Sequence, residues 1–188
     1  MKALIEALVD PKDPTLIFMF DLSSQMLEHR DRMKAEAERI LGAALEDVED
    51  PHITILYMGK GHTDEEVQST ADAAKKILKT VPEPMAIPKQ VTTFPISPQS
   101  EGRTPIIMTF DPLRLEPINV ALLRVTAKQN HQNQFPIYAP HMTLGYAARA
   151  VSDAEKAKLN RIRVPITFIP NKLVLNHGDQ RIARLTVG

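Results

Sequence analysis

A short phrase that carries a histidine and a threonine occurs twice in this chain, 89 residues apart. The first copy, PHITILY, begins at Pro51, and the second, PHMTLGY, begins at Pro140. Because side chains two residues apart on a strand point to the same face, each His should project beside its Thr. An imidazole has an unperturbed pKa of about 6.5, so it can accept or donate a proton near neutrality. Two such copies predict a cleft that holds one acid and one base.

The candidate site residues are the two His–Thr pairs, His52 with Thr54 and His141 with Thr143. The histidines are the candidate catalytic acid and base. The threonine hydroxyls are predicted to bind the non-bridging oxygens of a phosphate. This set suits cleavage of a phosphodiester without a metal ion, and the residues alone do not say which His is the acid.

Positions beside the His–Thr pairs extend the prediction. If both strands stay regular, Tyr57 and Tyr146 point away from the pairs and pack in the core. On the same assumption, Leu56 and Gly145 continue the row of the His–Thr pairs. Because Gly145 has no side chain, a ligand could approach the backbone there.

A matching helix start follows each copy of the phrase. Thr63 with Glu66, and Ser152 with Glu155, have the spacing of a capping box. A lone His-x-Thr would arise by chance quite often in a chain with six histidines. The doubled phrase with its matching helix caps favours function, and the alternative is an old duplication whose histidines serve only packing.

A metal role for the two histidines is a further alternative. The sequence offers no obvious third ligand and no helical His pair of the kind that metal sites use. We therefore expect neither a metal nor another cofactor. No glycine-rich phosphate loop or nucleophile elbow is present either.

Composition bounds the class of protein. With 188 residues, 43% of them hydrophobic, the chain can bury a core as a single domain spanning residues 1–188. The chain has no cysteine, which fits a reducing, cytoplasmic setting and excludes thiolate chemistry. No apolar run is long enough to span a membrane, so a soluble protein is expected.

Charge points to a small ligand. The net charge is zero, with 15 acidic and 7 basic side chains in residues 1–66 and the opposite imbalance in residues 67–188. Binding to duplex DNA usually demands a strongly basic face. A neutral chain fits a small nucleotide or oligonucleotide better, although unevenly distributed solvated helices explain the imbalance almost as well.

Strand and helix patterns alternate along the chain, which predicts an α+β or α/β protein. Helices are expected from Ser23 or Ser24 to about Leu45, from Thr63 to about Leu78, over Glu116–Gln129, and from Ser152 to near Arg161. Strands are expected at Thr15–Asp21, His52–Met58, Gln90–Phe94, Ile106–Phe110, Tyr138–Tyr146, Ile166–Ile169, Lys172–Asn176 and Arg181–Val187. Pro95–Pro105 has the composition of a loop.

The two His–Thr pairs, each on a hydrophobic strand, resemble the signature of the 2H phosphoesterase superfamily, which includes 2′-5′ RNA ligase-like proteins and cyclic phosphodiesterases. The resemblance spans roughly residues 14–187. It implies a bilobal, pseudo-twofold α+β fold in which two antiparallel sheets line a central cleft, with the helices outside and two similar lobes. Members that process RNA often carry an Arg shortly after the second pair, whereas Arg149 here is displaced.

The resemblance implies a metal-independent phosphodiesterase in which His52 and His141 are the acid–base pair and Thr54 and Thr143 hold the phosphate. The implied substrates are 2′,3′-cyclic ends, 2′-5′-linked oligonucleotides or cyclic oligonucleotide signals, and the superfamily includes phage proteins that destroy such defence signals. We expect a monomer that binds neither duplex DNA nor a membrane. The alternatives are a nucleotide- or RNA-binding module without turnover and a 2′-5′ RNA ligase.

Overall fold

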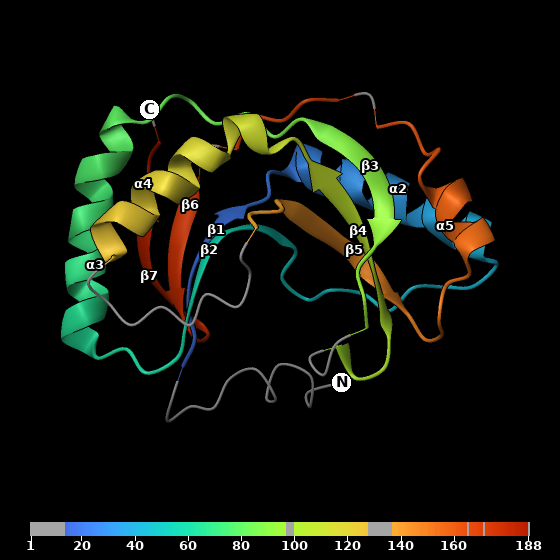
Figure 1. Ribbon diagram of the computed structural model, residues 1–188, viewed down its shortest axis with the longest axis horizontal. Coiled ribbons are helices and arrows are strands. Elements are labelled where there is room, and N and C mark those ends of the chain that lie inside the picture. Colours follow the sequence, from blue (N-terminus) through green and yellow to red (C-terminus); the bar gives the residue numbers. More distant parts are fainter. Residues whose placement is uncertain (1–13, 97–99, 128–136, 165, 171, 188) are drawn as a thin grey trace.

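A computed structural model describes residues 14–96, 100–127, 137–164, 166–170 and 172–187 (Figure 1). Its strands form one antiparallel sheet of seven, in the order β3-β4-β5-β2-β1-β6-β7. The strands are β1 Leu16–Asp21, β2 His52–Gly59, β3 Pro88–Thr93, β4 Thr104–Phe110, β5 His141–Ala147, β6 Leu173–His177 and β7 Gln180–Leu185. The helices are α2 Ser24–Leu41, α3 Asp64–Ile77, α4 Glu116–Thr126 and α5 Asp153–Leu159, with 3₁₀ turns at Leu78–Thr80 and Pro112–Arg114.

The sheet has a narrow junction at its middle. β2 and β5 pair at Ile53 and Met142, whereas each neighbouring pair of strands is joined along most of its length. The α+β class is confirmed. The two expected antiparallel sheets are the halves β3-β4-β5 and β2-β1-β6-β7, which this junction links into one sheet.

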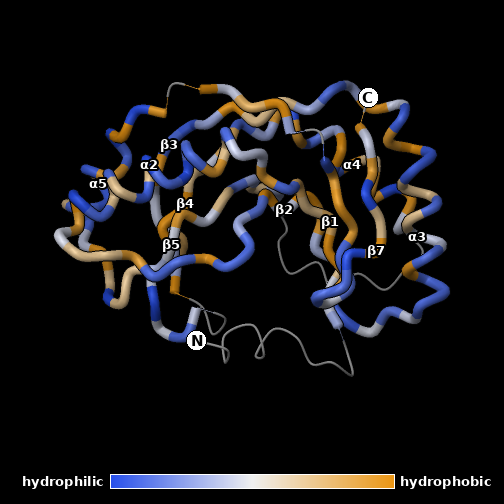
Figure 2. The backbone as a smooth tube through the Cα atoms, turned by 180° about the vertical axis from the view of Figure 1, so that it is seen from behind, coloured by the Kyte–Doolittle hydropathy of each residue, from blue (hydrophilic) through white to orange (hydrophobic). Residues whose placement is uncertain are grey.

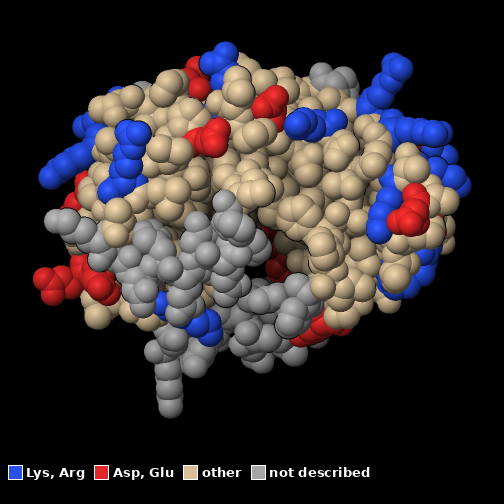
Figure 3. Space-filling view, viewed as in Figure 1, with Lys and Arg blue, Asp and Glu red and all other residues tan. Residues whose placement is uncertain are grey.

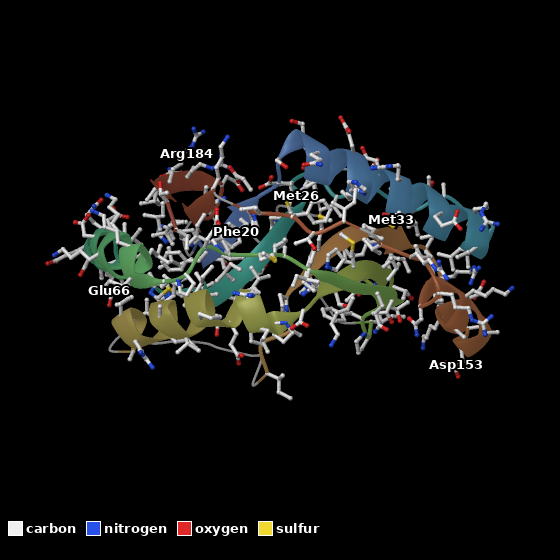
Figure 4. All side chains as sticks on the ribbon, turned by 90° about the horizontal axis from the view of Figure 1, so that it is seen from above. Phe20, Met26, Met33, Glu66, Asp153 and Arg184 are labelled. Atoms are coloured by element: carbon white, nitrogen blue, oxygen red, sulfur yellow. The ribbon has the colours of Figure 1, made fainter. Side chains whose placement is uncertain are left out.

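Helices cover the outer side of each half (Figure 1). α2 packs against β5 and α5, while α4 packs against β2 and α3. α2 and α4 therefore each lie on the half that does not contain the strand before them, because α2 follows β1 and α4 follows β4. Glu66 of α3 and Asp153 of α5 lie at opposite ends of the molecule (Figure 4).

Local sequence explains most of the element boundaries. Both predicted capping boxes are confirmed, at Thr63 with Glu66 and at Ser152 with Glu155. Hydrophobic residues fill the central strands, and the outer helices alternate hydrophobic and hydrophilic positions (Figure 2). These patterns place the core between the helices and the sheet.

Several predicted boundaries differ from the structure by a few residues, and two of the differences have a clear local cause. The first helix ends at Leu41 rather than Leu45, because Gly42 adopts a left-handed conformation with φ of 65° and its N–H donates to the Glu38 carbonyl. Ile166–Ile169 is not a strand. Only Phe168 pairs, through two backbone hydrogen bonds with Ala86. Prolines on both sides of that segment limit the bonds that a strand would make.

Each strand that carries a His–Thr pair contains a β-bulge at the same place. In β2 the pairing with β1 skips Ile55, and in β5 the pairing with β4 skips Leu144. Both residues follow the Thr directly. A bulge adds one residue to one strand, so the positions beyond it exchange faces.

The bulge in β5 overturns the prediction for Gly145. This residue does not continue the row of the His–Thr pairs. It lies against the segment before β2, where Glu46 pairs with Tyr146. A Cβ at position 145 would lie 2.7 Å from the Glu46 carbonyl oxygen and 2.9 Å from the Leu45 Cβ. Glycine is therefore required for close packing. Leu56, its counterpart in β2, is also buried in the core.

Substitution Gly145→Ala should lower the free energy of unfolding by about 1–3 kcal/mol, the usual cost of overpacking a close contact. Urea unfolding followed by circular dichroism measures the loss. Ala148→Ser, an exposed substitution three residues further on, is the control and should leave stability nearly unchanged. Equal stability of the two variants would contradict the close contact.

Candidate active site

The junction of the sheet brings the two His–Thr pairs together. Ile53 and Met142, the residues that pair there, are fully buried on the core side of the sheet. One residue away in each direction, the antiparallel register sets the His of each pair opposite the Thr of the other. All four of these side chains are half-buried, in contrast to their core-facing neighbours. The pairs therefore share the face of the sheet that lies opposite the core.

The two imidazole rings are held in the same way. Nδ1 of His52 lies 2.7 Å from the carbonyl oxygen of Asp50, and Nδ1 of His141 lies 2.9 Å from that of Ala139. A carbonyl can only accept, so in each ring the Nδ1–H donates. The proton-exchanging nitrogen is then Nε2 in both histidines. The two carbonyls belong to residues at the same 89-residue offset as the histidines.

The electrostatic environment distinguishes the two rings. Burial lowers the pKa of His141, the hydrogen bond to the Ala139 carbonyl opposes this effect, and the positive charge of His52 lowers the pKa further. The charge on one ring thus affects protonation of the other. Both rings belong to one electrostatic centre.

Phe94 supports the second histidine. Its ring lies 4.5 Å from the His141 ring, centroid to centroid, with the planes at 61°. This edge-to-face contact limits rotation of the imidazole. Phe94 follows β3 directly, at the start of the expected Pro95–Pro105 loop, part of which (residues 97–99) lies outside the described residues. The sequence pattern alone did not place this ring against the histidine.

The prediction that Tyr57 and Tyr146 pack in the core is wrong. Beyond each bulge the parity of the strand changes, so both tyrosines return to the face of the His–Thr pairs. Tyr57 pairs with Ile17 and Tyr146 with Pro105, and both tyrosines are half-buried. The repetition of Tyr in both phrases was the available signal. A regular strand would have placed these residues on the other face.

A buried polar side chain binds the carbonyl of each bulged residue. Nδ2 of Asn119 on α4 donates to the Ile55 carbonyl at 2.7 Å, and Nη2 of Arg30 on α2 donates to the Leu144 carbonyl at 2.9 Å. Arg30 and Asn119 are themselves 89 residues apart. A bulge leaves backbone groups without ladder partners, and these donors satisfy them. Both helices thereby hold the geometry of the strands that carry the His–Thr pairs.

Arg149, the displaced Arg of the second phrase, serves structure instead. Its guanidinium donates to the Glu155 carboxylate at 2.7 and 3.1 Å and to the Leu41 carbonyl at 3.0 Å. Arg149, together with the Ser152 cap, lowers the pKa of Glu155 to about 2. Arg149 therefore joins α5 to the end of α2.

The part of the chain that the structure describes contains no candidate metal site and no membrane-spanning helix, but it has a hollow near the His–Thr pairs. Within the described ranges, no three His, Cys, Asp or Glu side chains lie close enough to hold a metal ion. None of the described helices is long and apolar enough to cross a membrane. A hollow of about 270 Å³ lies between the start of α2 and the segment before β6. Its wall includes Asp21, which pairs with His52 in the sheet and forms an ion pair with Arg181 at 2.9 Å.

Substitution His52→Gln should raise the pKa of His141, because it removes a positive charge that lowers this pKa. Titration of the His141 ring protons by NMR measures the change. His177→Gln, at the far end of β6, is the control and should leave the pKa of His141 unaltered. A His141 pKa that stays constant in His52→Gln would place the two rings in separate environments.

Substitution Asn119→Ala should lower the free energy of unfolding by about 1–3 kcal/mol, because the buried Ile55 carbonyl loses its donor. Asn119→Asp tests the same bond by pH. A buried carboxyl facing a carbonyl keeps its proton, so its folded pKa is raised above the unfolded value of about 3.9. The free energy of unfolding of Asn119→Asp should fall below that of the parent by the smallest amount at acidic pH, and the difference should grow as pH rises. Chemical unfolding across pH measures it, and a deficit independent of pH would refute the bond.

Comparison with known proteins identifies the fold. No protein-family sequence model matches the chain, and no curated protein matches it by sequence. Solved structures do match. Usb1 of Kluyveromyces marxianus superposes with a TM-score of 0.63 at 10% identity, covering 93% of this chain and 98% of Usb1. TT0787 of Thermus thermophilus gives a TM-score of 0.61 at 13% identity, covering 92% of this chain and 97% of TT0787.

LigT of E. coli, solved in complex with NADP+, gives a TM-score of 0.60 at 15% identity, covering 94% of this chain and 96% of LigT. These similarities extend over nearly the whole of each chain. LigT, TT0787 and Usb1 are members of the 2H phosphoesterase superfamily. The chain therefore has the 2H phosphoesterase fold, as the resemblance of its two His–Thr pairs implied.

Proposed function

We propose that this protein is a metal-independent phosphodiesterase that hydrolyses 2′,3′-cyclic, 2′-5′-linked or otherwise cyclic nucleotide phosphodiesters. The observation that carries the proposal is that the same kind of hydrogen bond orients both imidazole rings. Each ring donates Nδ1–H to a carbonyl two residues earlier, so both use Nε2, and they project from paired strands on one face. Two such rings provide an acid and a base for one phosphate.

The environment of the rings suggests which is the base. Burial disfavours a positive charge on His141, which suits this ring to the role of the neutral base. His141 is then the base that takes a proton from the attacking water or hydroxyl. As the new P–O bond forms, His52 donates its proton to the departing oxygen and the old P–O bond breaks. Proton exchange with solvent restores the starting state.

The threonines hold the phosphate during this step. Because the register sets each Thr opposite the other strand's His, a phosphorus between the rings lies within reach of both hydroxyls. Thr54 and Thr143 donate hydrogen bonds to the non-bridging oxygens, whose charge changes in the transition state. Neutral donors of this kind contribute less than a proton transfer, so their loss should reduce the rate less than loss of a histidine.

Similar structures support a nucleotide ligand. LigT of E. coli has been solved in complex with phosphate, with 3′-AMP and with ATP as well as with NADP+. Those ligands contain a phosphate group, and all except free phosphate contain a nucleoside. Two His–Thr pairs on one face of the sheet suit the binding of such a phosphate group.

Surface charge favours a small substrate over a polymer. Lys and Arg side chains lie mostly around the rim of the face drawn in Figure 3 and gather at the end where α5 lies. A track of phosphates along duplex DNA needs a continuous basic surface. We therefore propose that the substrates are small nucleotides or oligonucleotides. The proposal also takes the protein to be a monomeric enzyme of a single domain with two similar lobes that acts in the cytoplasm.

Substitution of either histidine tests the reaction. His52→Ala and His141→Ala should each reduce kcat by about 10²–10⁴-fold, the usual contribution of one acid or base. Thr54→Val and Thr143→Val should reduce it less. Hydrolysis of 2′,3′-cyclic mononucleotides, 2′-5′ oligoadenylates and cyclic dinucleotides or trinucleotides, with products identified by mass, measures the rates.

The control is His177→Gln, which removes an imidazole at the far end of β6, outside the two His–Thr pairs, and should leave kcat unchanged. Circular dichroism and thermal unfolding of each histidine variant should match the parent. If folded histidine variants hydrolyse as fast as the parent, the acid–base proposal is wrong. If the parent binds these nucleotides without hydrolysing any, the protein is a binding module.

A further inference from the structure

We propose that Lys172, in the wall of the hollow beside His52, binds a second phosphate group of the substrate, one nucleotide away from the phosphate that is cleaved. The inference rests on the proposed function and narrows its substrates to phosphodiesters that carry a further phosphate next to the scissile one. Neither the repeated phrase nor the acid–base chemistry uses Lys172. Its place in the sheet, the charges around it and the hollow beside it support a site for an anion.

A row of three side chains leads from the cleft to Lys172. On one side, Asp21 at the end of β1 pairs with His52. On the other side, the Asp21 N–H donates to the Lys172 carbonyl at 3.0 Å, which continues the register of β1 with β6 by one residue. Directly opposite residues of an antiparallel sheet project to the same face. His52, Asp21 and Lys172 therefore project from neighbouring segments on the face of the His–Thr pairs.

The spacing of this row suits a substrate with two phosphates. Neighbouring strands lie about 4.8 Å apart, so the Lys172 backbone lies roughly 10 Å from the His52 backbone. The lysine adds a flexible four-carbon stem that ends in an ammonium with three donors. One phosphate between the imidazole rings and another at Lys172 can then belong to adjoining nucleotide units. Because His52 is the proposed acid, the second phosphate belongs to the departing part of the substrate.

The charges along the row leave Lys172 as an uncompensated cation. Arg181 on β7 contacts the Asp21 carboxylate twice at 2.9 Å, once at each oxygen. Such a bidentate pair neutralises the negative charge of Asp21. Among the residues that the structure describes, Lys172 forms no ion pair, and it is exposed. The far end of the row therefore presents a positive charge, which suits an anion.

The hollow beside the row has room for a phosphate group. Its volume of about 270 Å³ exceeds that of several water molecules, each of which occupies about 30 Å³ in the liquid. Met26, in its wall, lies near the middle of the molecule, where the two halves of the sheet meet (Figure 4). Apolar side chains of the same wall, including Leu22 and Ile169, displace water near the ammonium. A contact between opposite charges is stronger where less water surrounds it.

The test compares three forms of 2′-5′-linked diadenosine monophosphate: without a further phosphate, with a 5′-phosphate, and with a terminal 2′-phosphate. The two phosphorylated forms carry the second phosphate on opposite sides of the scissile one, so only the form in which it departs with the leaving nucleoside reaches Lys172. That form should have a kcat/KM about tenfold above that of the unphosphorylated dinucleotide, as expected for one charge-assisted contact. The gain should lie in KM rather than kcat, because Lys172 lies outside the acid–base pair.

Substitution Lys172→Gln should remove most of this gain, so that it lowers kcat/KM for the phosphorylated form about tenfold more than for the unphosphorylated form. Lys172→Arg keeps the charge and should stay within about threefold of the parent. Lys79→Gln removes an exposed lysine from the 3₁₀ turn at Leu78–Thr80 and is the charge-matched control, which should keep the gain. Added salt should reduce the gain in the parent, because it screens an exposed charge. Thermal unfolding confirms that each variant is folded.

Arg181 tests the charge balance of the row. Arg181→Gln leaves the Asp21 carboxylate without its partner, so this carboxylate should repel the second phosphate and reduce the gain about threefold or more. The double variant Asp21→Asn/Arg181→Gln removes both charges and should restore the gain. A gain that increases in Arg181→Gln would contradict the site, since the anion would then lie out of reach of these charges.

The outcomes separate this inference from the proposed function. If the parent hydrolyses the unphosphorylated dinucleotide and neither added phosphate raises kcat/KM more than about twofold, the second phosphate site is refuted while the phosphodiesterase stands. A gain that survives in Lys172→Gln refutes the site as well. If nothing is hydrolysed but calorimetry shows about tenfold tighter binding of a phosphorylated form, and Lys172→Gln removes that difference, the site stands and the reaction is refuted. Absence of binding of all three forms overturns both.

Discussion

The site depends on one narrow contact, the pairing of β2 with β5 at Ile53 and Met142. Both residues are fully buried, so the hydrophobic core fixes the junction, and the junction fixes the distance between the two halves of the sheet. The His–Thr pairs flank this contact on the other face. Core packing on one side of the sheet thus sets the separation of the two His–Thr pairs on the other.

The sequence predicted the features that depend on local pattern. The His–Thr strands, both capping boxes and the α+β class follow from side-chain spacing and cap chemistry, which act over a few residues. The two β-bulges could not be predicted from such local patterns. They are stabilised by Asn119 and Arg30 on helices distant in the sequence, and they decide which face Tyr57 and Gly145 occupy.

Both halves of the sheet contain a His–Thr strand with a bulge that a helix side chain supports, but the supporting residues differ. An amide supports one bulge and a guanidinium the other, while Leu56 and Gly145 fill corresponding positions after the bulges. The differences extend to the two histidine rings, because burial lowers the pKa of His141. Corresponding positions with unequal surroundings allow one ring to accept a proton while the other donates one.

The exchange of helices between the halves has a consequence for assembly. α2 lies on the half that contains β5, α4 lies on the half that contains β2, and β3 joins β4 rather than the strands that precede it. Neither half of the sheet can bury its hydrophobic face without a helix that follows a strand of the other half. The protein must therefore form through contacts between residues far apart in sequence, which slows folding and makes it strongly cooperative. A half-assembled intermediate would have only one of its two His–Thr pairs in place, and loosening either half would separate the two imidazole rings.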